Sequence, residues 1–280
     1  MRCLVWVLLW GASCGIAACG KEPGGTPGGI EPWTFVDGFE TADTSLASLF
    51  PSDGSRWTNL QRVDSETGPN RAWLSTDSFY EGAAALSLVA RQSGVTLSKM
   101  DIEKGGFFAP KGATIRAEAS FFIQGDDTLQ NLLLMDLECC SCWDPAVPDN
   151  QCPGIRLQFS GGNDWLVVER GKILGTSLRQ HSTRFPRNRW VPVVWELGLS
   201  PEADGANRLW IDGTLVIDEA GFNMPHAQAF ADTFALYGID FELAEPLGYE
   251  RFQIGATANA SDADVRLLVD DVRLYVAFGD

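Results

Sequence analysis

The sequence predicts an all-β fold, a two-sheet antiparallel jelly-roll sandwich with little helix. Every second side chain between residues 191 and 199 is apolar, as in a strand with one buried face: Val191, Val193, Trp195, Leu197 and Leu199. Two apolar segments, Leu209–Ile211 and Leu215–Ile217, flank Asp212-Gly213, a pair that accepts the positive φ angles of a type I′ hairpin turn. The chain has 29 glycines and 14 prolines among 280 residues and no long apolar repeat of 3.6 residues. We therefore expect many short strands joined by turns.

Residues 1–19 are predicted to be a lipoprotein signal peptide. Arg2 gives a positive start, and Leu4–Leu9 is an apolar run too short to span a bilayer. The run Ile16-Ala17-Ala18-Cys19 then resembles a bacterial lipobox, in which Cys19 would carry the lipid. The alternative is an ordinary secretory signal.

Residues 20–32, GKEPGGTPGGIEP, predict a flexible tether because they are rich in glycine and proline. Gly20 stands after Cys19 where an aspartate would signal retention at the inner membrane, by resemblance to the sorting rule of enteric bacteria. We therefore expect an exported chain that contacts the outer membrane or cell surface through its lipid anchor.

The formal net charge of the chain is −16 at pH 7. A field of this sign repels nucleic acids and strongly anionic polymers, so the sequence argues against nucleic-acid partners. Solubility alone also accounts for such a charge.

Four cysteines lie between residues 139 and 152: Cys139, Cys140, Cys142 and Cys152. An even number in an oxidising compartment predicts two disulfides that brace a long loop. Adjacent Cys139 and Cys140 do not readily pair with each other, so each is expected to reach Cys142 or Cys152. A zinc site is the alternative, although the segment lacks paired CxxC knuckles.

The predicted β-sandwich spans residues 33–280, with no repeat and no interior linker. Thr114–Ile123 shows the best alternation, and Asn131–Leu137 is fully apolar, as expected for a central strand. Residues 219–246 are expected to be less regular. The other expected strands are 55–63, 72–76, 82–90, 155–159, 165–169, 191–199, 209–211, 215–217, 252–256 and 265–275.

Several short motifs occur in an order that resembles concanavalin A-like lectin/glucanase sandwiches, including laminin-G-like modules and jelly-roll polysaccharide lyases. These are Phe39-Glu40, Gly82, Arg189-Trp190, Leu209-Trp210-Ile211-Asp212-Gly213 and Asp270-Asp271-Val272. The resemblance covers about residues 33–278. It is more specific for the fold than for function, because one fold hosts many functions.

The resemblance implies one structural calcium ion. Similar carbohydrate-binding modules hold Ca²⁺ between an N-terminal glutamate, a carbonyl near a glycine and a C-terminal aspartate. In this chain those residues would be Glu40, Gly82 and Asp271, with Asp270 or Asp37 as further candidates. Carboxylate and carbonyl oxygens are the ligands that calcium prefers. A plain pair of carboxylates at strand ends is the alternative.

A glycan is the second predicted ligand, because planar polar side chains on a sheet suit sugar binding. Strand alternation places Tyr249, Arg251 and Gln253 on one face of a strand. It also places Arg156 and Gln158 on a common face, and Arg179 and His181 on a common face. Surface Arg and Gln are also commonplace on strands without any ligand.

No catalytic motif is intact. Phe252–Asn259 resembles the strand of jelly-roll lyases that carries a lysine and a tyrosine, but Gln253 and Thr257 occupy those two positions. A threonine hydroxyl is a far poorer proton donor than a phenol. Asp136-Leu137-Glu138 lacks the third carboxylate of the glucanase motif.

The sequence is therefore interpreted as a lipid-anchored, lectin-like envelope protein that binds a polysaccharide or presents an interaction surface without catalysis. The alternative is a divergent polysaccharide lyase or glycoside hydrolase of the same fold. A purely structural envelope protein is a third possibility.

Overall fold

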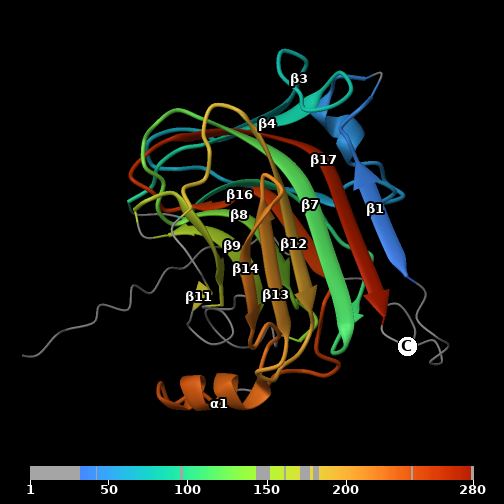
Figure 1. Ribbon diagram of the computed structural model, residues 1–280, viewed down its shortest axis with the longest axis vertical. Helices are drawn as coiled ribbons and strands as arrows, with labels where there is room; N and C mark the ends of the chain where they lie inside the picture. The colour runs from blue at the N-terminus through green and yellow to red at the C-terminus, as the bar shows by residue number, and fades with distance from the viewer. Residues whose placement is uncertain are drawn as a thin grey trace, which may run out of the picture.

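Two antiparallel sheets pack face to face in the computed structural model of this chain (Figure 1). The structure describes residues 32–41, 43–94, 97–142, 152–160, 162–170, 177–178, 183–240 and 242–278. The predicted signal peptide, its lipidation site Cys19 and nearly all of the predicted tether lie outside these residues. The described part of the chain contains no helix long and apolar enough to cross a membrane.

The first sheet has eight strands in the order β14-β13-β12-β7-β17-β4-β3, with β1 also paired to β17. Its long central strands β7 and β17 are paired antiparallel over most of their length. The bounds are β1 Trp33–Asp37, β3 Arg71–Ser75, β4 Ala85–Ala90, β7 Ala113–Gln124, β12 Trp190–Gly198, β13 Ala206–Ile211, β14 Thr214–Ala220 and β17 Val265–Phe278.

The second sheet has seven strands in the order β11-β10-β9-β8-β16-β5-β2. Its bounds are β2 Asn59–Val63, β5 Ser98–Lys104, β8 Leu132–Glu138, β9 Gly154–Ser160, β10 Trp165–Glu169, β11 Ser177–Leu178 and β16 Arg251–Asn259. A separate short pair joins β6 (Ala109–Pro110) to β15 (Gly248–Tyr249).

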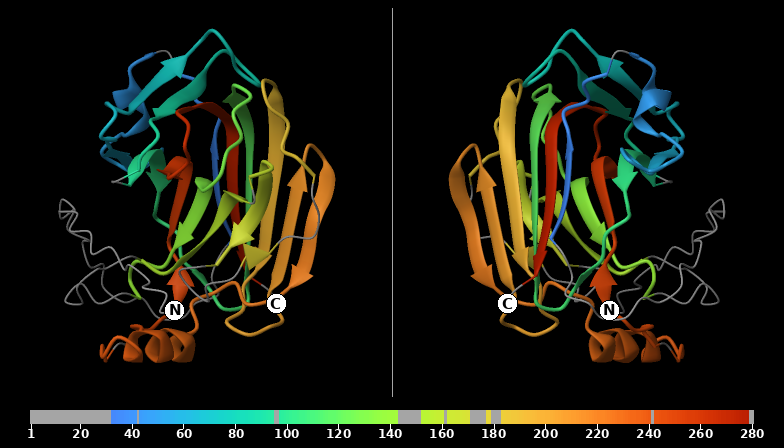
Figure 2. Two further views of the ribbon diagram at one scale, coloured as in Figure 1. Left: turned by 90° about the vertical axis from the view of Figure 1, so that its left-hand side faces the viewer. Right: turned by 90° about the vertical axis from the view of Figure 1, so that its right-hand side faces the viewer.

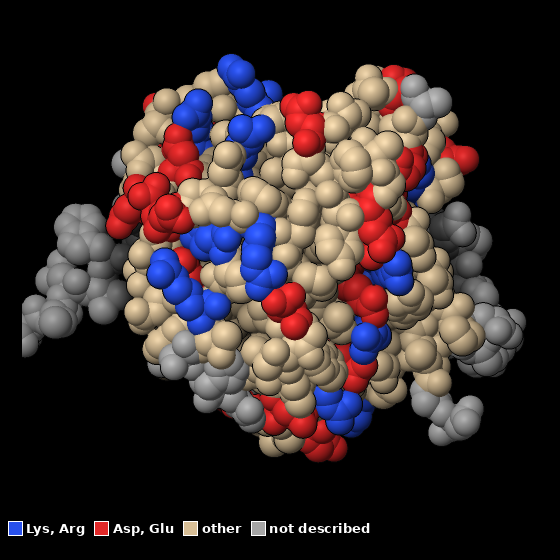
Figure 3. Space-filling view, turned by 45° about the horizontal axis from the view of Figure 1, so that its top comes forward, with Lys and Arg blue, Asp and Glu red and all other residues tan. Residues whose placement is uncertain are grey.

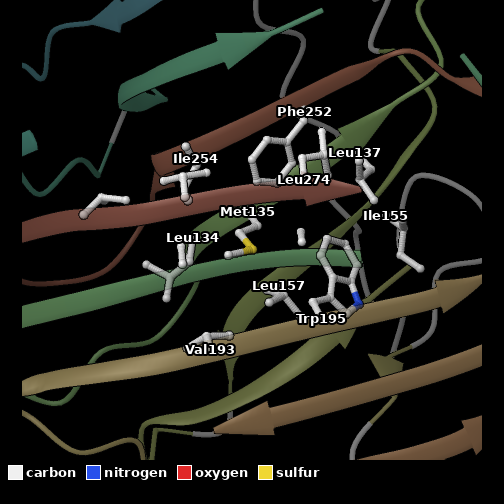
Figure 4. Packing of buried hydrophobic residues seen from close by; sticks show 14 of the residues in the cluster. Leu134, Met135, Leu137, Ile155, Leu157, Val193, Trp195, Phe252, Ile254 and Leu274 are labelled. Atoms are coloured by element: carbon white, nitrogen blue, oxygen red, sulfur yellow. The ribbon is translucent and has the colours of Figure 1, made fainter. Parts of the chain in front are cut away.

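The core lies between the two sheets and is built from alternate side chains of facing strands. Trp195 of β12 and Leu274 of β17 come from the first sheet, and Met135 of β8 and Phe252 of β16 come from the second (Figure 4). All four are almost fully buried. Strand alternation therefore sends the opposite side chains of β8 and β16 to the outer face of the second sheet.

The structure confirms the two-sheet antiparallel sandwich and the hairpin at Asp212-Gly213. Ile211 pairs with Thr214 across a two-residue turn. Asp212 has φ 53° and Gly213 has φ 74°, as a type I′ turn requires.

The sequence prediction missed strands β1 and β5, the two-residue strands β6, β11 and β15, and a short 3₁₀ helix, η1 (Leu46–Leu49). It also missed α1 (Ala227–Ala235), which lies at one end of the sandwich, outside both sheets (Figures 1 and 2). Phe230 is the only buried residue of this helix, and the His226 side chain accepts the Ala229 N–H at the start of the helix.

Gly255 in β16 occupies a position where any side chain would introduce strain. Its φ is +131°, and an added Cβ would lie 2.6 Å from Leu88 Cδ1 and 3.0 Å from the Met100 carbonyl oxygen. We expect Gly255→Ala to lower the free energy of unfolding by roughly 1–3 kcal/mol. Gly38→Ala is the control, because its Cβ would meet nothing closer than 4.0 Å. Denaturant unfolding of both variants tests this, and an equal effect of the two substitutions would contradict it.

Candidate functional site

The outer face of the second sheet carries charged and amide side chains on four neighbouring strands, and we call this set the polar face. Alternation accounts for it: in β5, Met100 and Ile102 enter the core while the residues between and beside them point outward. The same holds in β16, β8 and β9. The polar face consists of Lys99, Asp101, Glu103, Asp136, Glu138, Arg156, Gln158, Arg251 and Gln253.

Gln253 of β16 lies near the centre of the polar face and connects three of its four strands, β5, β16 and β8. It pairs across β5 with Glu103 and across β8 with Asp136. Its amide nitrogen donates to Glu138 Oε2 at 2.8 Å, and its amide oxygen accepts from Lys99 Nζ at 2.9 Å. Both ends of this planar amide are therefore fixed by charged partners.

Arg251 bridges two carboxylates from different strands. Its Nε lies 3.2 Å from Glu103 Oε2 on β5, and its Nη1 lies 3.4 Å from Glu138 Oε2 on β8. Gln61 of β2 also donates to Glu103, at 2.5 Å. Arg251 is the more accessible member, with 28% of its side chain exposed against 7% for Glu138.

Asp101 is the most deeply buried charge on this face, with an exposed fraction of 0%. Lys99 Nζ lies 3.5 Å from one carboxylate oxygen, and neither oxygen has a hydrogen-bond partner among the described residues. Burial raises the pKa of Asp101 well above its ordinary value, and the nearby charges of Glu138 and Glu103 add to the shift. Burial also raises the pKa of Glu103, against the opposing effect of Arg251.

The structure brings together four of the seven predicted glycan contacts: Arg251, Gln253, Arg156 and Gln158. Arg156 Nε lies 3.8 Å from Asp136 and 3.6 Å from Glu169, and Gln158 donates to the Asn131 side chain at 3.2 Å. Arg179 and His181 lie outside the described residues.

The placement of Tyr249 on this face was wrong. The sequence was interpreted as one strand through residues 249 to 253, but β15 ends at Tyr249 and β16 starts at Arg251. Tyr249 pairs with Ala109 in the separate short sheet, is fully buried, and donates its hydroxyl to the Asn223 carbonyl oxygen at 2.7 Å. Its phenol is therefore engaged within the fold.

The sequence analysis missed Lys99, Asp101 and Glu103, because strand β5 was not identified. A signal was present: apolar Met100 and Ile102 alternate with these three charged residues. Thr257, at the position where the resemblance places a catalytic tyrosine, is 4% exposed and its hydroxyl has no hydrogen-bond partner among the described residues.

Three of the five residues named for calcium, Glu40, Gly82 and Asp270, converge on the loop before β4, whereas Asp37 pairs with Arg56 at 2.6 Å. Glu40 Oε1 accepts the Ala83 N–H at 2.8 Å, and an added Cβ on Gly82 would overlap this carboxylate. Asp270 accepts the Tyr80 N–H at 2.7 Å, whereas Asp271 is paired with Arg273. An ion at this place would have to compete with amide donors that already face the carboxylates, so calcium binding stays a prediction.

Among the described cysteines, Cys139 and Cys142 form a disulfide, while Cys140 and Cys152 carry thiols. One of the two expected bridges is thus present, and it uses one of the pairings that the sequence left open.

Outside the polar face, charged side chains form ion pairs on the surface of the first sheet and line an open hollow between loops. On the first sheet Arg208 pairs with Glu196 and Asp218 at the surface, and Figure 3 shows positive and negative side chains interleaved over the visible side. At the loop end of the sandwich an open polar hollow of about 590 Å³ is present. It is lined by Thr67, Arg91, Gln92, Asp127, Thr128, Asp262, Ala263 and Asp264.

Comparison with known proteins identifies the fold through solved structures. No protein-family model matches the chain, and no curated protein matches it by sequence. The endo-β-1,4-glucuronan lyase of the fungus Trichoderma reesei superposes with a TM-score of 0.55 at 12% identity, covering 80% of this chain and 91% of that one.

Two further structures are similar to the same extent. The alginate lyase Aly36B has a TM-score of 0.54 at 10% identity and covers 88% of this chain and 98% of its own. The cellulose induced protein Cip1 has a TM-score of 0.54 at 12% identity, with 79% and 92% covered. A variant of Aly36B was solved with an alginate trisaccharide. At these identities the likeness establishes the concanavalin A-like β-sandwich fold that this chain shares with polysaccharide lyases.

The raised pKa of Asp101 predicts that this residue makes the fold less stable as the pH rises. Because burial raises its pKa in the folded state, the folded chain keeps a proton that the unfolded chain loses above about pH 4. Asp101 therefore costs more stability as the pH rises from about 4 to 7. We expect Asp101→Asn to gain stability relative to the wild type over this range, in denaturant unfolding at several pH values.

Asp53→Asn is the matched control for this pH series. Hydrogen bonds from Ser55 lower the pKa of Asp53, so its contribution is present at neutral pH and is lost as the pH falls through its lowered pKa. The two variants should therefore show opposite pH trends. A pH-independent difference for Asp101→Asn would contradict the raised pKa.

Calcium binding is tested by titrating the EDTA-treated chain with CaCl₂ in a calorimeter and by following its melting temperature. We expect calcium to release or absorb heat and to raise the melting temperature, and we expect Glu40→Gln to abolish both effects. Glu118→Gln, at an ion pair with Arg116 on the first sheet, is the control and should keep the response. No heat and no shift in the wild type would end the calcium hypothesis.

Proposed function

We propose that this chain acts on a polysaccharide, which it holds against the polar face and cleaves there. One observation carries the proposal: Lys99, Arg251, Gln253 and several carboxyl groups gather on adjacent strands at the centre of one sheet. The shared fold with a glucuronan lyase and an alginate lyase supports the same conclusion.

Binding relies on side chains that can pair with hydroxyl and carboxylate groups of a sugar. Arg251 presents a planar guanidinium with five donors, and it is the most exposed charge among the central residues of the face. The carboxyl groups of Glu103 and Glu138 hold it in place. A fixed side chain loses less conformational freedom when a ligand binds.

Cleavage needs a proton donor near the glycosidic oxygen, and Glu103 suits this role. Burial raises the pKa of its carboxyl group, so it keeps a proton to higher pH than an ordinary glutamic acid does. If the substrate is a uronate, elimination also needs a base for the C5 proton and a cation for the sugar carboxylate. On this face Lys99 is the candidate base and Arg251 is the candidate cation.

The second candidate function is glycan binding without cleavage. It is supported by Thr257, which is buried and stands where lyases of similar sequence pattern carry a tyrosine, and by Tyr249, which is engaged inside the fold. Export and lipid anchoring through Cys19 remain part of the proposal under either function.

The test is a glycan array on the full chain, followed by product analysis for every glycan bound. We expect Arg251→Ala to weaken binding at least tenfold, because a charge-assisted hydrogen bond contributes about 1.5–3 kcal/mol. Arg208→Ala is the control, since Arg208 sits in comparable ion pairs on the outer face of the other sheet. Equal losses in the two variants would contradict binding at the polar face.

Product analysis then separates the two functions. Cleavage by elimination gives an unsaturated sugar that absorbs ultraviolet light, and hydrolysis gives new reducing ends without that absorbance. Binding with neither product would favour the second candidate.

A further inference from the structure

Two cysteines lie beside the polar face at the point where β8 and β9 meet. Strand β8 ends at Glu138 and β9 begins at Gly154, so Cys140 and Cys152 flank neighbouring strand ends. The backbone is also joined here, because Cys139 N donates to the Pro153 carbonyl oxygen at 2.8 Å. The sulfur atoms of Cys140 and Cys152 and a carboxylate oxygen of Glu138 all lie within 4.8 Å of one another.

These three groups could hold a soft metal ion or the two sulfurs could bond to each other. A metal needs both thiols ionised and needs the carboxylate of Glu138 as a ligand. That carboxylate already accepts from Gln253 and pairs with Arg251, whose positive charge opposes a cation. The hydrogen bond with Cys152, burial and the charge of Glu138 all raise the pKa of the Cys140 thiol, which disfavours the thiolate.

A covalent bond between the sulfurs avoids these costs, because a disulfide carries no charge next to Glu138. The neighbouring pair Cys139–Cys142 is already bonded, so the same short segment forms a disulfide. We propose that Cys140 and Cys152 form a second disulfide, which ties the end of β8 to the start of β9 beside Glu138. This bond does not depend on the proposed function of the polar face.

The bond forms by two thiol–disulfide exchanges with an external disulfide, such as that of a disulfide oxidoreductase. The exchange takes place in the newly exported chain, before burial raises the pKa of the Cys140 thiol. One thiolate attacks the external disulfide and releases a thiol, and the second thiolate attacks the mixed disulfide and releases another thiol. Two electrons and two protons pass from Cys140 and Cys152 to the external partner. The closed loop joins residues 140 and 152.

The pairing is tested on the full chain produced in an oxidising compartment. The chain is unfolded in the presence of an alkylating agent, which blocks free thiols, and is then digested for mass spectrometry. We expect the peptide with residues 139–142 to be linked to the peptide with Cys152. In Cys142→Ser the alkyl group should then lie on Cys139, because its partner is gone and Cys140 remains bonded to Cys152. An alkyl group on Cys140 in that variant would overturn the pairing.

Two further results would also overturn it: alkylation of both Cys140 and Cys152 in the wild type, or one zinc ion per chain together with two intact thiols. Thermal melting gives an independent measure. Cys140→Ser, Cys152→Ser and the double variant should lose the same amount, roughly 5–10 °C, because either substitution removes the same bond. A double variant that loses the sum of two separate effects would show that the cysteines are not bonded.

Discussion

The pairing of nearly buried charges on the outer face of the second sheet is the constraint on which the candidate site depends. Glu138 is 7% exposed in its side chain, and a carboxylate at such a place is stable only when donors surround it. Gln253 and Arg251 supply those donors from β16, the next strand. Removing either partner would weaken the compensation of this nearly buried charge, and the remaining contacts connect side chains of β5, β16 and β8.

Burial on the same face raises the pKa of Asp101 and of Glu103. Each lies near Glu138 in a region where water is largely excluded, so a further negative charge is costly. The cations on the face compensate only part of this charge. Groups with shifted pKa values in such surroundings are characteristic of functional sites, and this supports assigning the polar face a chemical role.

Much of the fold could be predicted from alternation, because a period of two residues fixes which side chains share a face. It identified β12, β7 and β17, and it placed Arg251 with Gln253 and Arg156 with Gln158. The Asp212-Gly213 turn could be predicted because few residue pairs accept two positive φ angles. Local chemistry was sufficient in each of these cases.

The rest depended on contacts between distant parts of the chain. Nothing near Gln253 in the sequence shows that Lys99, more than 150 residues earlier, lies on the adjacent strand. Asp136 and Glu138 lacked a third carboxylate when considered along one strand, yet β16 brings Glu103 of β5 to the same Arg251 guanidinium that pairs with Glu138. Tyr249 was misplaced because the break between β15 and β16 comes from pairing with β6, which alternation does not reveal.

The most direct test of the central claim is a crystal structure of the chain with a glycan selected from the array. We expect a sugar ring over β5, β16 and β8, with Arg251 and Gln253 in hydrogen-bond contact. A sugar bound in the hollow lined by Arg91, Asp262 and Asp264, or on the outer face of the first sheet, would contradict it.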